Sequence, residues 1–484
     1  MNVILARYLS ILAFICMTLS ITTIPKVEAG EVEDFVAKLK THYQKAPSLE
    51  VFSLNYHYLG GGDPYQSWDY QVPNRYTAIR MVEIDLIKKY FIENDIHHFS
   101  GGRRFDRVQF QNDTESFFYD RNGLALGKRV IKQSMDSFEE IKGFIFMNVD
   151  FLAVTPLLEE NNVSATIKLR QDNKLKQTIL RHKISDDSVI DYVFSDSPLQ
   201  LVSINNKSAQ KKYVYSDYQT VNGITFAHSI LKYYDGDTRP SFIHSIDQLN
   251  ILDKIEPTRL QVPKEFGPII PESDRTLVSK EIAPNLYLVT DDSAWRNSLF
   301  KVNGDEITVF GAAVNKELAE ETIKLILTQF PNKKITSVYV THPHGDHIAG
   351  LLAYAKKGIA VRADAYSVEA IKAYPDFSND IAMFKFETIE HNEMVDGVRF
   401  YVLENTHAKR ESFAYFKASG IIYQADLLEV AFDNTIAKVI PNTTKTFIDF
   451  VRRKQLNFNR IVGHHRNNNI TLEVMNKAYD GYIM

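Results

Sequence analysis

The sequence predicts an α/β (α+β) chain made of two parts with different secondary-structure patterns. Residues 30–270 contain stretches in which apolar and polar residues alternate, which is typical of β-strands with one buried face. Residues 271–484 alternate strand-like and helix-like segments, which is typical of a layered α/β domain. Between them, "VPKEFGPIIPESD" (262–274) carries three prolines and interrupts the first pattern, so we place the domain boundary there.

The first 29 residues differ from both parts. Arg7 is their only early charge, and the apolar run "YLSILAFICMTLSITTI" follows it. Val27 and Ala29 are small residues at the places that a signal peptidase requires, so the sequence predicts a cleaved signal peptide and a periplasmic or secreted protein. A membrane anchor is the alternative, although the run is short for a spanning helix. Cys16 is the single cysteine, so the mature chain would have no disulfide and no thiolate ligand.

Composition narrows the range of partners. The net charge is −4 and no long basic run occurs, which argues against nucleic acid and against an anionic membrane surface. We expect no transmembrane segment in the mature chain. A small-molecule substrate is the expected partner, and the features are compatible with a homodimer.

The elements of the first part are read from periodicity and turn residues. We expect a helix at 31–44, a longer helix at 138–160, and a hairpin at 215–237 that turns at Asn222–Gly223. His97–His98 is expected to lie on a solvated face rather than to bind a metal. Clear strand patterns occur at 48–60, 104–111 and 165–171.

The second part begins with three strand patterns and then a helix at 315–330. A further strand at 335–340 runs directly into "THPHGDHIAG" (341–350), after which the pattern is helical. Three more chemistry-bearing segments follow strand patterns downstream: "ENTHAKRES", "IIYQADLLEV" and "RIVGHHR". The three initial strands are expected at 285–290, 298–302 and 306–310.

The histidine-rich segment has the spacing of a metal site. His342 and His344 are two positions apart in extended chain, so their side chains point the same way and can hold one cation. Asp346 and His347 open the next helix and point elsewhere, toward a second site. The alternative is a helix-capping aspartate among solvated histidines. Asp426 directly follows a buried strand, where an acid is costly unless it is paired or bound to a metal.

With these residues in view, residues 276–484 resemble the metallo-β-lactamase superfamily of metallohydrolases. The family pattern is H-x-H-x-D-H followed by a His, an Asp and a His at strand ends, and all seven positions occur here in order. The resemblance implies a four-layer αββα sandwich and two metal ions. It assigns the first ion to His342, His344 and His407, the second to Asp346, His347 and His464, and a bridging role to Asp426.

Two positions need comment. His464 is preferred to His465 because the family ligand directly follows a glycine. His465 is then a candidate for contact with a metal ligand or with the substrate, and the alternative is a solvated neighbour. The family also places an outer-shell Asp after an early strand, whereas "TVFGAAV" (308–314) has no acid. Since outer-shell partners orient ligands, the site is expected to be supported differently or less tightly.

The resemblance implies an exported dinuclear zinc hydrolase that uses a metal-bridging hydroxide to cleave an ester-like bond, namely a thioester, lactone or phosphodiester. Iron or manganese are alternative metals. Asp346 is the candidate catalytic residue for proton transfer to the leaving group. A β-lactamase is disfavoured because those enzymes usually have Cys or Ser at the place of Asp426. A binding or carrier protein with this fold and little catalysis is the other function class that stays open.

Substrate contacts are expected near the mouth of the site. Trp295, Arg296 and Asn297 lie on one loop, and Lys409 and Arg410 follow the predicted ligand His407. The β-rich first part faintly resembles the half-barrels of periplasmic lipoprotein carriers. Such a concave sheet would hold an apolar tail of the substrate, or serve as a docking or dimerisation surface.

Overall fold

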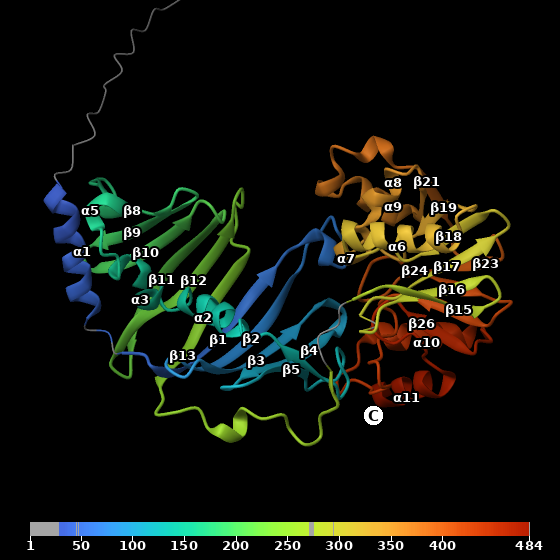
Figure 1. The fold of residues 1–484 in the computed structure, drawn as a ribbon, viewed down its shortest axis with the longest axis horizontal. Helices are drawn as coiled ribbons and strands as arrows, with labels where there is room; N and C mark the ends of the chain where they lie inside the picture. Colours follow the sequence, from blue (N-terminus) through green and yellow to red (C-terminus); the bar gives the residue numbers. More distant parts are fainter. Residues whose placement is uncertain (1–28, 45, 47, 271–274, 294, 484) are drawn as a thin grey trace, which may run out of the picture.

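A computed structural model describes residues 29–483 apart from 45, 47, 271–274 and 294. The predicted signal peptide therefore lies outside the described residues, except for Ala29. The described chain forms one 14-stranded sheet followed by a 7-stranded and a 5-stranded sheet (Figure 1). Among the helices in the described ranges, none has both the length and the apolar character needed to cross a membrane.

The first sheet contains every strand up to residue 270. Its strands pair antiparallel, except that β14 is parallel to β6. The expected hairpin is confirmed, because Asn222 and Gly223 both have positive φ (54° and 79°), as a tight two-residue turn requires. In spatial order the strands are β14 (Ile269–Ile270), β6 (Val130–Gln133), β5 (Ser116–Asp120), β4 (Arg104–Gln111), β3 (Tyr90–His98), β2 (Arg75–Asp85), β1 (Val51–Gly61), β13 (Phe242–Ile251), β12 (Ile224–Tyr234), β11 (Lys211–Val221), β10 (Leu199–Asn206), β9 (Ser188–Asp196), β8 (Gln177–Ser185) and β7 (Ile167–Asp172).

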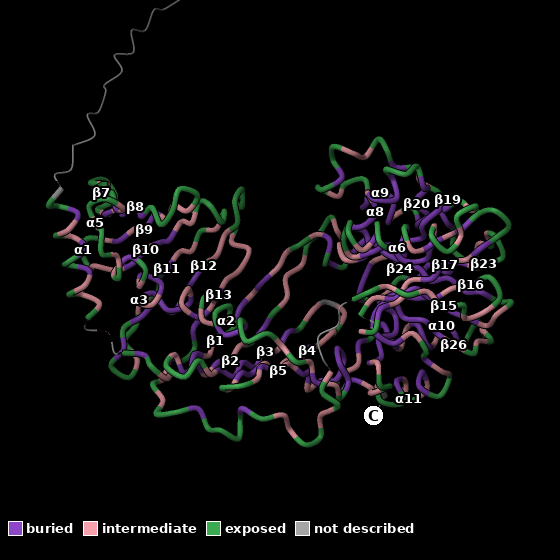
Figure 2. The backbone as a smooth tube through the Cα atoms, in the orientation of Figure 1, coloured by how far each residue is buried: buried purple, intermediate pink, exposed green. Residues whose placement is uncertain are grey.

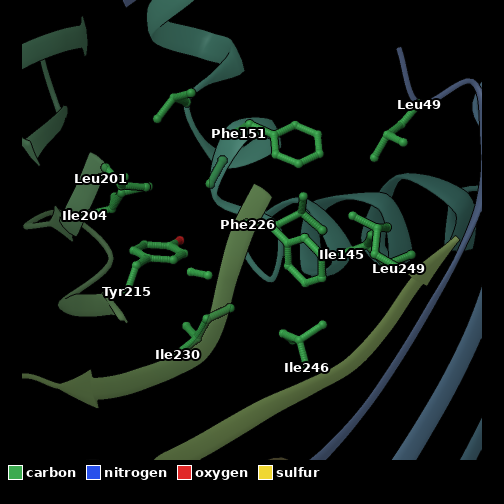
Figure 3. Close-up of a cluster of buried hydrophobic side chains, with 14 of the residues drawn as sticks. Leu49, Ile145, Phe151, Leu201, Ile204, Tyr215, Phe226, Ile230, Ile246 and Leu249 are labelled. Atoms are coloured by element: carbon green, nitrogen blue, oxygen red, sulfur yellow. The ribbon is translucent and has the colours of Figure 1, made fainter. Parts of the chain in front are cut away.

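Helices pack on this sheet through a shared apolar core. Ile145 and Phe151 from the helices meet Phe226, Ile246 and other strand residues there (Figure 3). The single helix expected at 138–160 is wrong: extended backbone at Val149 (φ −131°, ψ 106°) ends its first piece. The helices are α1 (Ala29–Tyr43), α2 (Ser137–Phe146), α3 (Asp150–Ala153), α4 (Thr155–Leu158) and α5 (Val163–Thr166).

The side chains of His97 and His98 lie on opposite faces of strand β3. Successive β3 side chains point to opposite faces, so His98 is exposed whereas His97 is buried. The Nε2 atom of His97 lies 2.7 Å from Asp95 and 2.8 Å from the Tyr58 hydroxyl. The expected solvated face therefore holds for His98 and is wrong for His97.

The second part is a four-layer αββα sandwich, as expected. Its two sheets pack face to face through buried side chains such as Phe310, Tyr339, Phe400 and Tyr423. Buried backbone runs through both sheets (Figure 2). The larger sheet contains β15 (Val278–Ala283), β16 (Leu286–Thr290), β17 (Ser298–Asn303), β18 (Glu306–Phe310), β19 (Lys334–Tyr339), β20 (Ala360–Asp364) and β21 (Phe386–Ile389); the smaller contains β22 (Glu393–Val395), β23 (Val398–Leu403), β24 (Glu411–Phe416), β25 (Ile421–Gln424) and β26 (Arg460–Gly463).

Helices form the two outer layers. The apolar face of the first helical layer packs on the 7-stranded sheet, and that of the second packs on the 5-stranded sheet. This arrangement buries one face of each sheet against helices and the other against its partner sheet. The first layer comprises α6 (Lys316–Gln329), α8 (Leu351–Ala355) and α9 (Ala365–Lys372), the second α10 (Asn442–Arg453) and α11 (Leu472–Ile483), and the short α7 (Gly345–Ile348) follows β19.

The two parts contact each other through loops of the first sheet. The connection between β1 and β2 extends toward α7 (Figure 1), where the Tyr65 hydroxyl donates to the carbonyl of Ala370 at 3.0 Å. In the same connection, the Trp68 indole N–H donates to the carbonyl of Asn405 at 2.8 Å. On another loop, the Asn122 side chain accepts from the N–H of Val439 at 2.9 Å. The first part therefore lies directly against the segments that carry the predicted ligands.

Candidate metal centre

The fold brings all the predicted ligands to one place. His342 and His344 follow β19, and Asp346 and His347 lie in α7. The remaining ligands come from loops that end strands of the smaller sheet. Six of the seven predicted ligands, together with His465 in place of His464, form two groups in which potential ligand atoms lie within 4.8 Å of one another: His342, His344, His407 and Asp426, and then Asp346, His347 and His465.

The first group is fully buried. His407 Nε2 lies 2.9 Å from Asp426 Oδ2, and His342 Nε2 lies 3.6 Å from the same oxygen. Yet His342 Nε2 and both ring nitrogens of His407 have no hydrogen-bond partner among the described residues. Burying unpartnered polar atoms is unfavourable, by roughly 1–3 kcal/mol each. Ring nitrogens that lie close to one carboxylate oxygen, yet have no hydrogen-bond partner, fit the ligands of a bound cation.

The orientation of His344 is fixed by the first part of the chain. Its Nε2 lies 3.0 Å from the carbonyl oxygen of Ser67. Because a carbonyl only accepts, Nε2 carries the hydrogen and Nδ1 keeps the lone pair that a metal requires. Burial lowers the pKa of His344 to about 3, so the imidazole is neutral at physiological pH.

The second group meets the first at Asp426. His465 Nε2 lies 2.9 Å from Asp426 Oδ1 and 3.1 Å from His347 Nε2. Thus Asp426 Oδ2 lies near His342, His407 and, at 3.5 Å, His347, and Asp426 Oδ1 lies near His465. Burial opposes ionisation of this carboxyl, but His465 and Arg103 hold its pKa well below the usual range. A carboxylate that lies close to residues of both groups has the position of a bridge between two cations.

His464 lies at the edge of the second group. Its ring centroid is 4.8 Å from that of His347, and its buried Nε2 has no partner in the described chain. Its Nδ1 lies 2.8 Å from the Tyr423 hydroxyl. The structure therefore places both His464, the assigned ligand, and its neighbour His465 beside His347. Of the two, His465 lies nearer to Asp346 and Asp426.

Tyr423 occupies the space left by the missing acid. Gly311 has φ +93°, and a Cβ there would lie 2.0 Å from the Tyr423 hydroxyl oxygen. Glycine at 311 therefore makes room for the tyrosine, which supports His464 in place of an acid on the strand end after Phe310. The sequence lacks the family's acid at 308–314, and in the structure Tyr423 supports a ligand instead.

The expected substrate residues fall into three situations. Arg296 donates to Asp346 Oδ2 at 3.1 Å and also contacts His465, so both lie in the centre. Asn297 is buried, and its amide donates to the carbonyls of Gly463 and Arg466, which holds the turn that carries His464. The others lie further out: Trp295 is 36% exposed, Lys409 pairs with Asp69 at 2.6 Å, and Arg410 pairs with Glu404 at 3.3 Å.

Several residues of the centre escaped the sequence reasoning. Gln66 donates to Asp346 at 3.3 Å, and Arg103 donates to Asp426 at 3.4 Å. These contacts join residues 280 and 323 positions apart, so no local pattern could reveal them. Glu411 accepts from the backbone N–H of Asp426 at 2.9 Å, and an acid at the start of a buried strand was an available signal. Glu429 and Arg466, which form an ion pair, were also missed.

Comparison with known proteins agrees with this geometry. The model of the metallo-beta-lactamase superfamily matches residues 297–408, which include His342, His344, Asp346, His347 and His407. The C-terminal part is a metallo-β-lactamase-fold domain. No curated protein matches the chain.

Metallo-β-lactamases are among the solved structures that match part of the chain. One from Hirschia baltica is 13% identical, covers 43% of this chain and 98% of its own, and has a TM-score of 0.36. FIM-1 from Pseudomonas aeruginosa, in its mono-zinc form, is 15% identical, covers 44% and 97%, and scores 0.34. A third, from Erythrobacter litoralis, is 16% identical, covers 43% and 96%, and scores 0.33.

Proposed function

We propose that the chain is an exported dinuclear zinc hydrolase that cleaves a thioester, lactone or phosphodiester bond. The observation that carries the proposal is the place of Asp426, whose carboxylate lies close to residues of both groups of candidate ligands. The apolar run that precedes Val27 and Ala29 supports export. The domain boundary near residue 270, where the first sheet ends, is part of the same proposal.

The donor set fits two ions of zinc. His342, His344 and His407 would hold one, Asp346 and His347 the other, and Asp426 would bridge them. His464 would complete the second site through Nε2, with its Nδ1–H donating to Tyr423; the position of His465 makes it the competing ligand. Nitrogen and carboxylate donors without thiolate favour zinc, and iron or manganese accept the same set. When bound, such ions polarise the scissile carbonyl or phosphoryl group and lower the pKa of water.

Asp346 is the residue placed to move a proton. Burial raises its pKa, but His347 and Arg296 outweigh that effect and hold the pKa well below the usual range. Gln66 and Arg296 each donate to a different oxygen of this carboxylate, which fixes its orientation. As an oriented carboxylate it would help to transfer a proton to the leaving group.

A cavity between the two parts supports a substrate with an apolar portion. Its volume is about 380 Å³, within the range of small-molecule sites. Trp295 lies on its wall and precedes Arg296, which contacts Asp346. We assign the apolar part of the substrate to this cavity rather than to the concave face of the sheet. Its apolar lining comprises Phe118, Leu126, Ile131, Ile270, Trp295 and Phe432.

A substrate panel tests the proposed function. Zinc-loaded protein and protein stripped with a chelator are assayed on a thioester, a lactone, a phosphodiester and a β-lactam. We expect turnover of at least one of the first three, loss on stripping, and recovery when zinc returns. Turnover of the β-lactam alone would indicate the disfavoured lactamase. Tight binding of ligands by zinc-loaded protein without any turnover would favour the carrier protein.

A further inference from the structure

Three arginines gather around one phenyl ring beside the centre. The guanidinium carbons of Arg103, Arg107 and Arg466 lie 5.9, 4.6 and 5.9 Å from the centroid of Phe105. Two of these arginines come from the first part of the chain, on and just before β4, and one comes from the turn after β26. Three positive charges from two distant segments therefore share one small region.

Their negative partners are fewer than the positive charges. Glu429 is buried and forms ion pairs with both Arg103 and Arg466. Arg107 is mostly buried, yet no carboxylate in the described chain is in ion-pair contact with it, and its Nε has no hydrogen-bond partner. The charges of Asp95, Asp120 and Glu93 act on it, but Asp95 already pairs with Arg80 and His97, and Glu93 pairs with Arg80. Asp120 accepts backbone N–H groups.

The cluster adjoins the metal centre. Arg103 Nη1 lies 3.4 Å from Asp426 Oδ2, and Arg466 directly follows His465 in the chain. The loop before Arg103 packs closely against the loop that carries His407, since a Cβ at Gly101 would lie 3.0 Å from the carbonyl oxygen of Thr406. A single small molecule could therefore place an anionic group at the cluster and its scissile bond at the metal centre.

We propose that Arg103, Arg107 and Arg466 form an anion-binding subsite that holds a carboxylate or phosphate group of the substrate, separate from the bond that is cleaved. The inference deepens the proposed function and rests on it, because it identifies the substrate as an organic anion. Guanidinium groups suit this task, as their planar N–H donors match the oxygens of carboxylates and phosphates. Arg107 supplies the charge that Glu429 leaves unpaired.

Three esters of equal length isolate the effect of the anion: 4-nitrophenyl butyrate, 4-nitrophenyl succinate and 4-nitrophenyl 3-phosphonopropionate. All three carry the same leaving group and differ only at the far end, which is neutral, a carboxylate or a phosphonate. We expect the zinc-loaded full chain to prefer one or both anionic esters in kcat/KM. The stronger of the two identifies the anion.

The Arg107→Gln variant then tests the subsite. We expect kcat/KM for the preferred anionic ester to fall about tenfold, as for a lost charge-assisted hydrogen bond, with butyrate hydrolysis and zinc content unchanged. Arg107→Lys should restore part of the preference. Arg104→Gln is the matched control: this arginine points from the opposite face of β4 and lies 3.8 Å from Asp106, so no preference should change.

An equal loss for all three esters, or no loss for any, would overturn the subsite. If the wild-type protein bound zinc but hydrolysed none of the esters, the substrate panel alone would decide the proposed function. The subsite would then be judged by calorimetric binding of succinate and 3-phosphonopropionate. Binding that is weaker in Arg107→Gln than in wild type supports it, and equal binding in the two proteins contradicts it.

Discussion

Replacing Asp426 with asparagine is expected to abolish hydrolysis and to reduce the binding of both metal ions. Its carboxylate lies close to residues of both donor groups, so one substitution removes a charged ligand from each. Mutating a residue that only supports a metal ligand typically lowers metal affinity or activity about 10- to 100-fold. Loss of the shared ligand itself should therefore lower kcat/KM on the order of 10³-fold or more. Zinc content and steady-state kinetics on the best panel substrate measure both effects.

The control for this variant is Asp305→Asn, because Asp305 lies on an exposed turn of the same domain. It should keep wild-type zinc and activity. Circular dichroism should show that both variants are folded. An Asp426→Asn protein that retained two ions and full turnover would show that Asp426 does not bridge the sites.

Glu429→Ala is expected to lower the free energy of unfolding by about 3–5 kcal/mol. The buried carboxylate lies between Arg103 and Arg466, so its removal leaves two guanidinium groups close together with no shared counter-ion. Since Arg103 belongs to the first part and Arg466 to the second, the loss should also weaken the contact between them. Urea denaturation followed by intrinsic fluorescence measures the change.

Glu404→Ala provides the matched comparison. Glu404 is 77% exposed in its ion pair with Arg410, and an exposed pair contributes roughly 0–1 kcal/mol. Equal stabilities of the Glu429→Ala and Glu404→Ala proteins would mean that the buried cluster does not hold the two parts together.

The sequence was sufficient for the positions that follow strands. His342, His344 and Asp426 could be placed because a polar residue directly after an apolar strand lies at the edge of a sheet, where strand ends meet. The strands at 104–111 and 306–310 have the predicted bounds, since each is a short run of strand-forming residues. Local pattern therefore predicts those parts of the site that each depend on a single strand and its end.

The rest depends on contacts between distant segments. The carbonyl of Ser67, which orients His344, is a backbone group, so the type of residue at position 67 does not indicate this contact. Arg103 reaches the centre only because the sheet of the first part lies against the ligand loops. The arrangement of His464 and His465 depends on the turn that Asn297 holds and on the hydroxyl of Tyr423, neither of which is adjacent in sequence.

Counting bound zinc is the most direct test of a two-ion centre. Full-length folded protein is stripped with a chelator, titrated with zinc, passed through a desalting column and measured by elemental analysis alongside hydrolysis of the best substrate. The account predicts close to two tightly bound ions per chain, with activity that continues to rise until the second is bound. Folded protein that retained no zinc, or reached full activity with a single ion, would contradict it.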